Sequence, residues 1–217
     1  MSRERWLWRG IALVVFGTAI WLIQVPAIHH VREVNYTTKE LSNAKQIYLA
    51  LKMYERDHNG ARPGLEDGGA VASSNEVFRR LIPDYLTQEK IFYSRRSPWT
   101  PKPPDGKMGQ GRTLSAGENC FAYVLNVLPD SNKNFPLIAS AFGKGSPGTY
   151  GWDPKIKRRA PEGRAIIVRN DGSGIATKIE EDGRVYDYGD VGSQEKIDLF
   201  KPAPGWLAPD QVPLNPK

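Results

Sequence analysis

The sequence predicts an α+β fold in which one long N-terminal helix packs on a small antiparallel β-sheet. Three observations predict it. An uncharged apolar run lies near the N-terminus, a stretch with helical periodicity follows it, and short apolar runs separated by Asp-Gly turns occupy the C-terminal half. The 217 residues include 21 Gly and 17 Pro, which favours short elements and many turns over a helical bundle.

The apolar run Ile11–Val25 carries no charge, and with its apolar flanks it approaches the ~20 residues that a bilayer-spanning helix needs. We expect residues 1–28 to form a membrane anchor, with tryptophans at the interfaces and one arginine reaching out of the hydrocarbon. The positions that define this anchor are Trp6, Arg9, Ile11, Trp21 and Ile23. Basic residues before the run predict a cytoplasmic N-terminus and a domain on the far side of the membrane. The alternative is a signal peptide cleaved after Ala27, which would export the same domain.

A second helical stretch, residues 29–59, continues directly from the anchor. It contains no Gly before the pair Asn59-Gly60, which together with Pro63 predicts the end of the helix near Asp57. Its apolar side chains recur every three or four residues, which predicts one buried face. That packing face consists of Leu41, Ala44, Ile47, Tyr48, Leu51 and Tyr54.

Residues 60–217 are predicted to form an α+β head. Ser73 and Glu76 fit a capping box for a short helix over residues 74–82, and the Pro- and Gly-rich segment 97–112 is predicted to be an exposed loop. Strands are expected at residues 120–127, 136–142, 164–168, 175–179 and 184–188, the last three as a meander through two Asp-Gly turns. The Pro-rich tail, residues 202–217, is expected to be extended and to pack Trp206 and Leu207 on the head.

The sequence contains none of the motifs that would indicate an enzyme. It has no G-x-S-x-G, no HExxH and no P-loop, and one cysteine with three histidines cannot form a Cys-rich or His-rich metal site. We therefore predict a non-enzymatic protein without a resident cofactor. His58 is expected to interact with the C-terminal carbonyl groups of the long helix, and Cys120 is expected to be a small buried residue.

Two segments have strong and opposite charge. Residues 180–198 have a net charge of −5, and Asp187, Asp190 and Asp198 are candidate ligands for Ca²⁺ because several oxygens from one loop can converge on that ion. The alternative is a solvated acidic surface, since the spacing matches no EF-hand. Residues 153–169 have a net charge of +4, but no base-reading motif is present, so nucleic acid is not an expected partner. Complementary patches of this kind would also suit packing between subunits.

This order of elements resembles the type IV pilin fold, and several stretches resemble bacterial pseudopilins, in particular the major pseudopilin of type II secretion. The stretches are residues 43–60, 75–93, 97–105 and 206–216. The resemblance implies a pilin-like head in the periplasm, a single-pass anchor in the inner membrane, and other pilin-like subunits, including copies of this chain, as partners together with membrane lipid. It also implies calcium in a C-terminal loop.

The N-terminus departs from the family pattern. Pilins and pseudopilins place a Gly, then Phe, then a Glu at the start of the apolar helix, whereas here Gly10 precedes Ile11 and no acid occurs between Glu4 and Glu33. On the basis of the resemblance over the rest of the chain, our leading hypothesis is a structural subunit of a type II secretion or pilus-type assembly. The alternative is a membrane-tethered binding module that does not polymerise, and a third hypothesis is an exported hydrolase with clustered carboxylates.

Overall fold

A computed structural model describes residues 3–65, 71–109, 112–153, 158–159, 163–189 and 195–217. Within these ranges the side chains of residues 3–5, 7, 19, 22–30, 32–33, 152–153 and 158–159 are not described. The chain divides into two compact units, Met1–Lys39 and Glu40–Lys217, and each is described here by itself.

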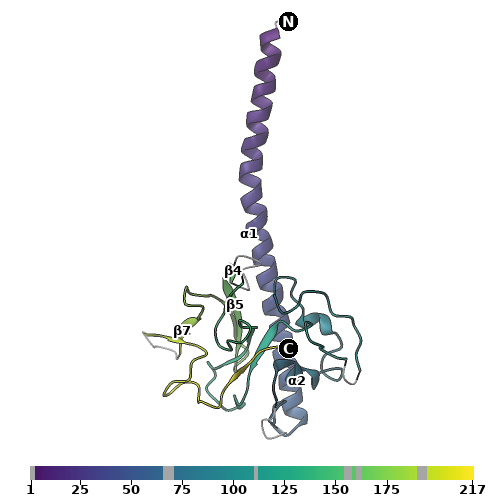
Figure 1. The fold of residues 1–217 in the computed structure, drawn as a ribbon, viewed down its shortest axis with the longest axis vertical. Helices are drawn as coiled ribbons and strands as arrows, with labels where there is room; N and C mark the ends of the chain where they lie inside the picture. The colour runs from purple at the N-terminus through teal and green to yellow at the C-terminus, as the bar shows by residue number, and fades with distance from the viewer. Residues whose placement is uncertain (1–2, 66–70, 110–111, 154–157, 160–162, 190–194) are drawn as a thin grey trace. The chain divides into compact units, whose positions relative to one another are not determined.

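Helix α1 (Arg3–Asp57) is the longest element of the described chain (Figure 1). It ends where the sequence predicts. Asn59 and Gly60 adopt left-handed conformations, with φ of +53° and +86°, and the Gly60 N–H donates to the Glu55 carbonyl at 2.7 Å. A left-handed residue directly after the last turn is a common helix terminator, because it closes hydrogen bonds to carbonyls that the helix leaves free.

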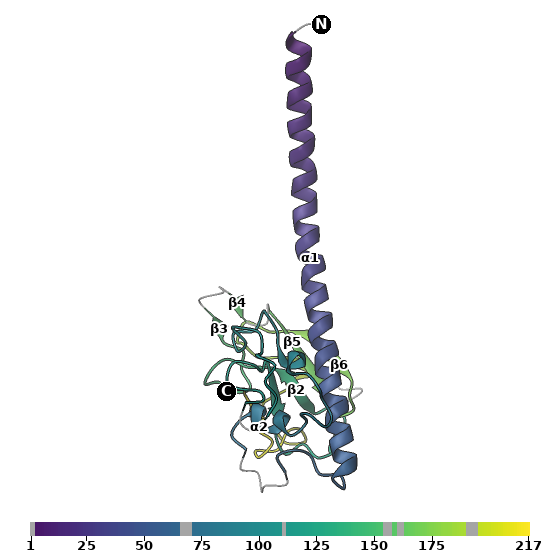
Figure 2. The ribbon, with the colours of Figure 1, turned by 90° about the vertical axis from the view of Figure 1, so that its right-hand side faces the viewer.

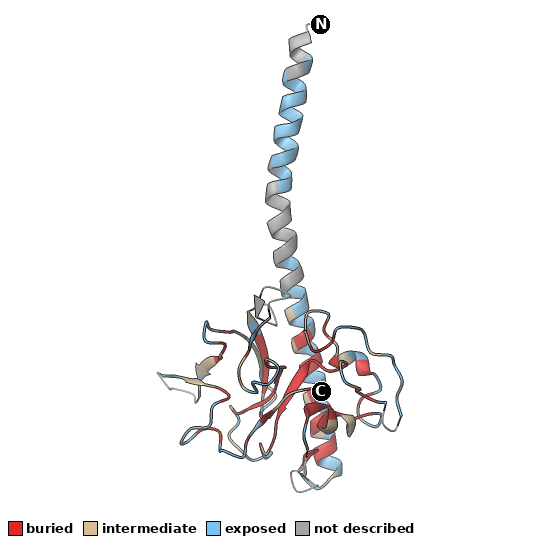
Figure 3. Ribbon diagram, in the orientation of Figure 1, coloured by how far each residue is buried: buried red, intermediate tan, exposed pale blue. Residues whose placement is uncertain are grey.

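The first unit is helical from Arg3 onward, and its described side chains are mostly exposed (Figure 3). Large apolar side chains are among them, including Trp8, Leu13 and Phe16. Of the helices in the described part of the chain, none has an apolar stretch long enough to cross a bilayer.

The second unit contains a five-stranded antiparallel sheet in the order β6-β5-β2-β1-β9. The strands are β1 (Phe121–Val124), β2 (Pro136–Ser140), β5 (Arg164–Arg169), β6 (Gly174–Lys178) and β9 (Pro213–Leu214). Strands β1 and β2 are buried along their whole length, whereas β6 at the edge is only half-buried. Buried and exposed side chains do not alternate in β1 and β2, because both faces of these strands are covered.

The last turns of α1 lie beside β5 and β6 (Figure 2), and their apolar face joins the core of the head. Ala44, Ile47 and Leu51 are fully buried in one cluster with side chains of β1, β2 and β5. The structure therefore confirms an α+β fold with an antiparallel sheet, and it places the predicted packing face of the helix in the core of that fold.

Smaller elements complete the head: helix α2 (Ser74–Arg79), the 3-10 helix η1 (Glu89–Phe92) and two short hairpins. One hairpin pairs β3 (Trp152–Asp153) with β4 (Arg158–Arg159), and the other pairs β7 (Tyr186–Tyr188) with β8 (Lys196–Asp198). Helix α2 is shorter than predicted, because the chain continues after Arg79 in tighter turns, in which the N–H of Leu81 donates to Phe78 rather than to Val77.

The predicted three-strand meander is wrong in its last strand. Strands β5 and β6 form the expected hairpin, but β7 pairs with β8 in a separate sheet and not with β6. The Asp182-Gly183 turn explains the difference. The Tyr150 N–H donates to the Gly183 carbonyl at 2.7 Å, and a Cβ on Gly183 would come within 2.6 Å of the Tyr150 carbonyl oxygen. Docking of this turn on Tyr150 directs the following strand away from the free edge of β6.

The C-terminal tail packs on the head as predicted. Trp206 and Leu207 are buried, and the indole of Trp206 meets the ring of Phe135 edge to face. The tail also contributes β9 beside β1, which the sequence did not predict because Pro213 reads as a strand breaker. Proline is tolerated there because β9 is an edge strand.

Candidate functional site

The first candidate site is the apolar surface of the N-terminal unit. Trp6, Trp8 and Trp21 are 65%, 70% and 65% exposed, and Arg9 and Ile11 are exposed as well. Ile23, the last predicted anchor position, lies outside the residues whose side chains are described. Scattered apolar side chains are normal on a protein surface, but a run of this density marks a surface for lipid or for another protein.

The packing face of the helix has a different role. Leu41 and Tyr48 are half-buried and pack against the core, and the Tyr48 hydroxyl donates to the Asn170 carbonyl at 3.0 Å. A Cβ on Gly172 would lie 2.5 Å from the Tyr48 ring, and one on Gly174 would lie 2.7 Å from Leu41. The β5–β6 turn therefore needs glycine in order to approach the helix this closely. This face is used inside the head and is not available to a partner.

A buried ion pair joins the helix to the head, and sequence reasoning missed it. Arg62 has no exposed surface, Glu55 is 4% exposed, and the Arg62 Nε donates to the Glu55 carboxylate. The two terminal nitrogens of the same guanidinium donate to the Val127 carbonyl and to the Asn170 Oδ1, both at 2.7 Å. A planar fork of donors suits this arrangement, since one arginine reaches three acceptors from three segments.

The two predicted calcium ligands that the structure describes, Asp187 and Asp198, do not converge. Asp190 lies outside the described residues. Asp187 accepts from Arg169 at 2.6 Å, and Asp198 accepts from Arg184 at 2.7 Å. The register pairs Asp187 with Ile197 and Asp198 with Tyr186, so the two carboxylates leave opposite faces of the β7–β8 hairpin. Each of the two described ligand candidates is thus paired with an arginine instead.

The basic segment is part of the same pairing, because Arg169, its last residue, binds Asp187 of the acidic segment within one chain. Residues 154–157 and 160–162 of the basic segment lie outside the described residues. At least one contact between the two charged segments is therefore internal to the head.

The single histidine with a described side chain, His58, behaves as predicted. Its ring stacks on Tyr54 with 3.7 Å between centroids, and its Nδ1 lies 2.9 Å from the Tyr54 carbonyl oxygen at the end of α1. The side chains of His29 and His30 lie outside the described residues. Cys120 is buried, and burial raises the pKa of its thiol, as expected for an unreactive core cysteine.

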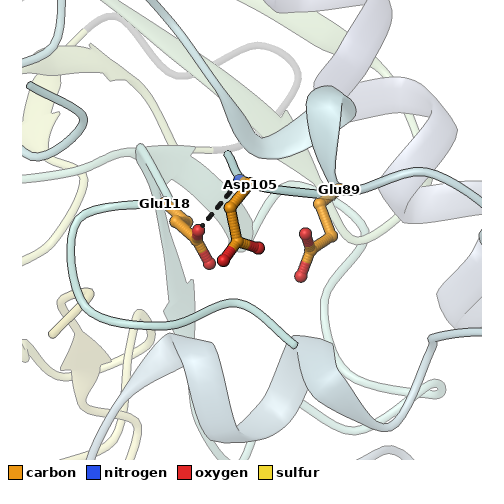
Figure 4. Close-up of side chains that lie close together, drawn as sticks. All are labelled: Glu89, Asp105 and Glu118. Carbon is orange, nitrogen blue, oxygen red and sulfur yellow. Dashed lines mark hydrogen bonds between the residues drawn. The ribbon is translucent and has the colours of Figure 1, made fainter. Parts of the chain in front are cut away.

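A second candidate site, not foreseen from the sequence, is a cluster of three carboxylates (Figure 4). Glu89 begins η1, Asp105 lies in the Pro-rich loop after it, and Glu118 lies in the turn that leads to β1. One oxygen of each lies within 4.8 Å of the other two. Because the three residues are 16 and 13 positions apart and come from irregular segments, no sequence motif marks them.

Comparison of the chain with protein-family models, with curated proteins and with solved structures gave no match. The functional argument therefore relies on the two candidate sites themselves.

Proposed function

We propose that the chain is a non-enzymatic, membrane-anchored, pilin-like structural subunit of a type II secretion or pilus-type assembly. The observation that carries this proposal is the contrast along α1. From Glu40 onward its apolar face is buried in the head, whereas the apolar side chains around Trp8 and Phe16 are exposed. An exposed apolar helix surface needs lipid or other helices around it.

In this proposal the two parts of α1 have different functions. Residues 1–28 form the anchor in the inner membrane, with the N-terminus in the cytoplasm and the head in the periplasm. Inside the bilayer, stems of neighbouring subunits associate by close packing rather than by the hydrophobic effect, because lipid tails are as apolar as the side chains. Surface charges on the heads then set the register between subunits.

A second candidate function is a membrane-tethered binding module that does not polymerise. One observation favours it: no acidic residue occurs between Glu4 and Glu33. Without an acid the apolar stem has no charged side chain that could pair with a neighbouring amine inside the membrane, so assembly would depend on packing alone.

Cysteine cross-linking distinguishes the two functions. Leu49 is a well-exposed apolar residue of α1 on the side away from the core. Leu49→Cys in a Cys120→Ser background has one thiol per chain, so subunits packed side by side are expected to give a disulfide-linked dimer on oxidation of membranes. Asp130→Cys, at an exposed turn of the head, is the matched control. A membrane-bound protein that stays monomeric at Leu49→Cys would support the tether. A chain recovered only in the soluble fraction would contradict both functions.

N-terminal sequencing of the membrane-bound protein gives an independent test. A mature N-terminus at Ile11 would support processing as a filament subunit, and an intact Met1 would support the tether.

A further inference from the structure

The carboxylate cluster contains a buried oxygen with no hydrogen-bond partner. Glu89 is 2% exposed; its Oε1 accepts from the Leu114 N–H at 2.7 Å, but its Oε2 is unpartnered. In Figure 4 Asp105 lies between Glu118 and Glu89, and the unpartnered oxygen belongs to Glu89 at one end of this group. A buried carboxylate oxygen without a donor costs free energy, so such an atom calls for a ligand or a proton.

The other two carboxylates are held in place by backbone groups. Glu118 is 3% exposed and accepts from the N–H groups of Ser115 at 2.7 Å and Asp105 at 3.2 Å, one on each oxygen. Asp105 is exposed and accepts from the Lys107 N–H at 2.9 Å. A carboxylate oxygen has two lone pairs, so each of these oxygens can still bind a cation while keeping its backbone donor.

The charge of the cluster is not balanced by the protein. In the part of the chain that the structure describes, neither Glu89 nor Glu118 forms an ion pair, and the one cation in contact is Lys107, whose ammonium lies 3.2 Å from Asp105. Three carboxylates and one ammonium leave two negative charges. Burial raises the pKa of Glu89, and the charges of Glu118 and Asp105 raise it further.

We propose that Glu89, Asp105 and Glu118 bind one divalent metal ion, with Ca²⁺ as the best fit. The ligand set consists of carboxylate oxygens, which hard cations prefer, and it contains no nitrogen or sulfur to favour zinc. Two oxygens bonded to one Ca²⁺ at 2.3–2.6 Å can be up to about 4.6–5.2 Å apart, and the three oxygens here lie within 4.8 Å of one another. A charge of +2 would also neutralise the cluster.

The cluster borders a groove on the Glu89 side. A groove of about 510 Å³ next to the cluster is lined by Glu89 and Gly106 together with Tyr93 and Met108. Asp105 is exposed, so water can complete the coordination sphere from that side. A bound ion would tie η1 and the loop that carries Asp105 to the start of β1, and would thereby stabilise the folded head. The proposal is independent of the proposed function.

Calcium titration of the full-length chain after EDTA treatment tests this assignment. Equilibrium dialysis is expected to show one bound Ca²⁺ per chain, and the thermal midpoint is expected to rise with Ca²⁺ and to fall again with EGTA. The Glu89→Gln variant is expected to lose the bound ion and the shift. Because burial already disfavours the charge on Glu89, the neutral glutamine should not prevent folding, which far-UV circular dichroism of the metal-free protein checks.

A matched control separates this cluster from the acidic C-terminal segment. Asp187→Asn removes a carboxylate that is paired with Arg169, and it is expected to leave the bound calcium unchanged. The proposal is overturned if Ca²⁺ does not bind at about 5 mM, above the 10⁻⁴–10⁻³ M range of weak extracellular sites. It is also overturned if Glu89→Gln keeps the ion while Asp187→Asn loses it.

Discussion

Replacing Arg62 with methionine tests how the helix is fastened to the head. The guanidinium is fully buried and donates to Glu55, to the Val127 carbonyl and to Asn170, so the substitution leaves the Glu55 carboxylate buried without its main partner. Breaking a buried pair in this way costs about 3–5 kcal/mol. For a chain of this length about 1 kcal/mol corresponds to roughly 2–4 °C, so the thermal midpoint should fall by about 6–20 °C.

Urea unfolding followed by circular dichroism measures the free energy of unfolding directly, and an unchanged m-value confirms that the folded state is still compact. Lys52→Met is the matched control, because Lys52 also binds Glu55 but its side chain is 42% exposed. An exposed pair is worth about 0–1 kcal/mol, so the control should lose little.

The double variant Glu55→Leu with Arg62→Met removes both charges and should recover part of the lost stability, because no charge is then left buried. The reasoning is refuted if Arg62→Met costs less than about 1 kcal/mol, which is the value of an exposed pair. It is also refuted if the double variant is less stable than Arg62→Met alone.

Two further predictions concern the same core. Gly172→Ala should lower the free energy of unfolding, measured in urea, by about 2–4 kcal/mol, since φ is +83° and the new methyl group would meet the Tyr48 ring. The control Gly205→Ala, with φ of +75° and open space around it, should lose only the part that comes from backbone strain. Equal losses in the two variants would contradict the packing argument. Burial raises the pKa of Glu40, and the hydrogen bond from the Ser94 hydroxyl opposes this shift. The protonated carboxyl therefore stabilises the folded state below about pH 4, and this contribution is lost as the pH rises through the raised pKa. Glu40→Gln should therefore become more stable relative to the unmodified protein between pH 4 and 8, and a constant difference across this range would exclude the assignment.

The parts of the fold that follow from local pattern were predictable from the sequence. Helical spacing identified Ala44, Ile47 and Leu51 as core residues, and Asn59-Gly60 marked the end of the helix. The predicted capping box forms only in part. Ser73 is the N-cap of α2, but its hydroxyl contacts the Glu76 carboxylate at 3.2 Å instead of a backbone N–H.

The features that were not predictable depend on contacts between distant segments. The position of β7 follows from a turn that docks on Tyr150, and periodicity carries no information about which edge a short strand will join. Arg62 looks like a surface residue in the sequence, because its acceptors come from α1, from the segment after β1 and from the turn after β5. The strand at Pro213 was not predicted, because proline is tolerated only in a strand at the edge of a sheet.

The same reason separates the two metal hypotheses. Asp187 and Asp198 are close in sequence, and that closeness suggested a site, yet each lies beside an arginine that neutralises it. Glu89 and Glu118 are far apart in sequence and suggested nothing, yet the fold buries both, and no cation of the described residues forms an ion pair with either. What distinguishes a candidate metal site is therefore charge left without compensation after folding, and not the density of acids in the sequence.

Apolar surface that stays exposed on α1 also supports the proposed function. Folding of the head buries the apolar face of α1 around Leu51, and the Arg62 network satisfies the polar groups next to it. Within the described part of the first unit the apolar side chains around Phe16 receive no such partner, so in the proposed function they need contact with lipid or with other chains. Lipid and neighbouring stems both meet this need, and the disulfide-linked dimer at Leu49→Cys decides whether neighbouring subunits lie beside this chain as well as lipid.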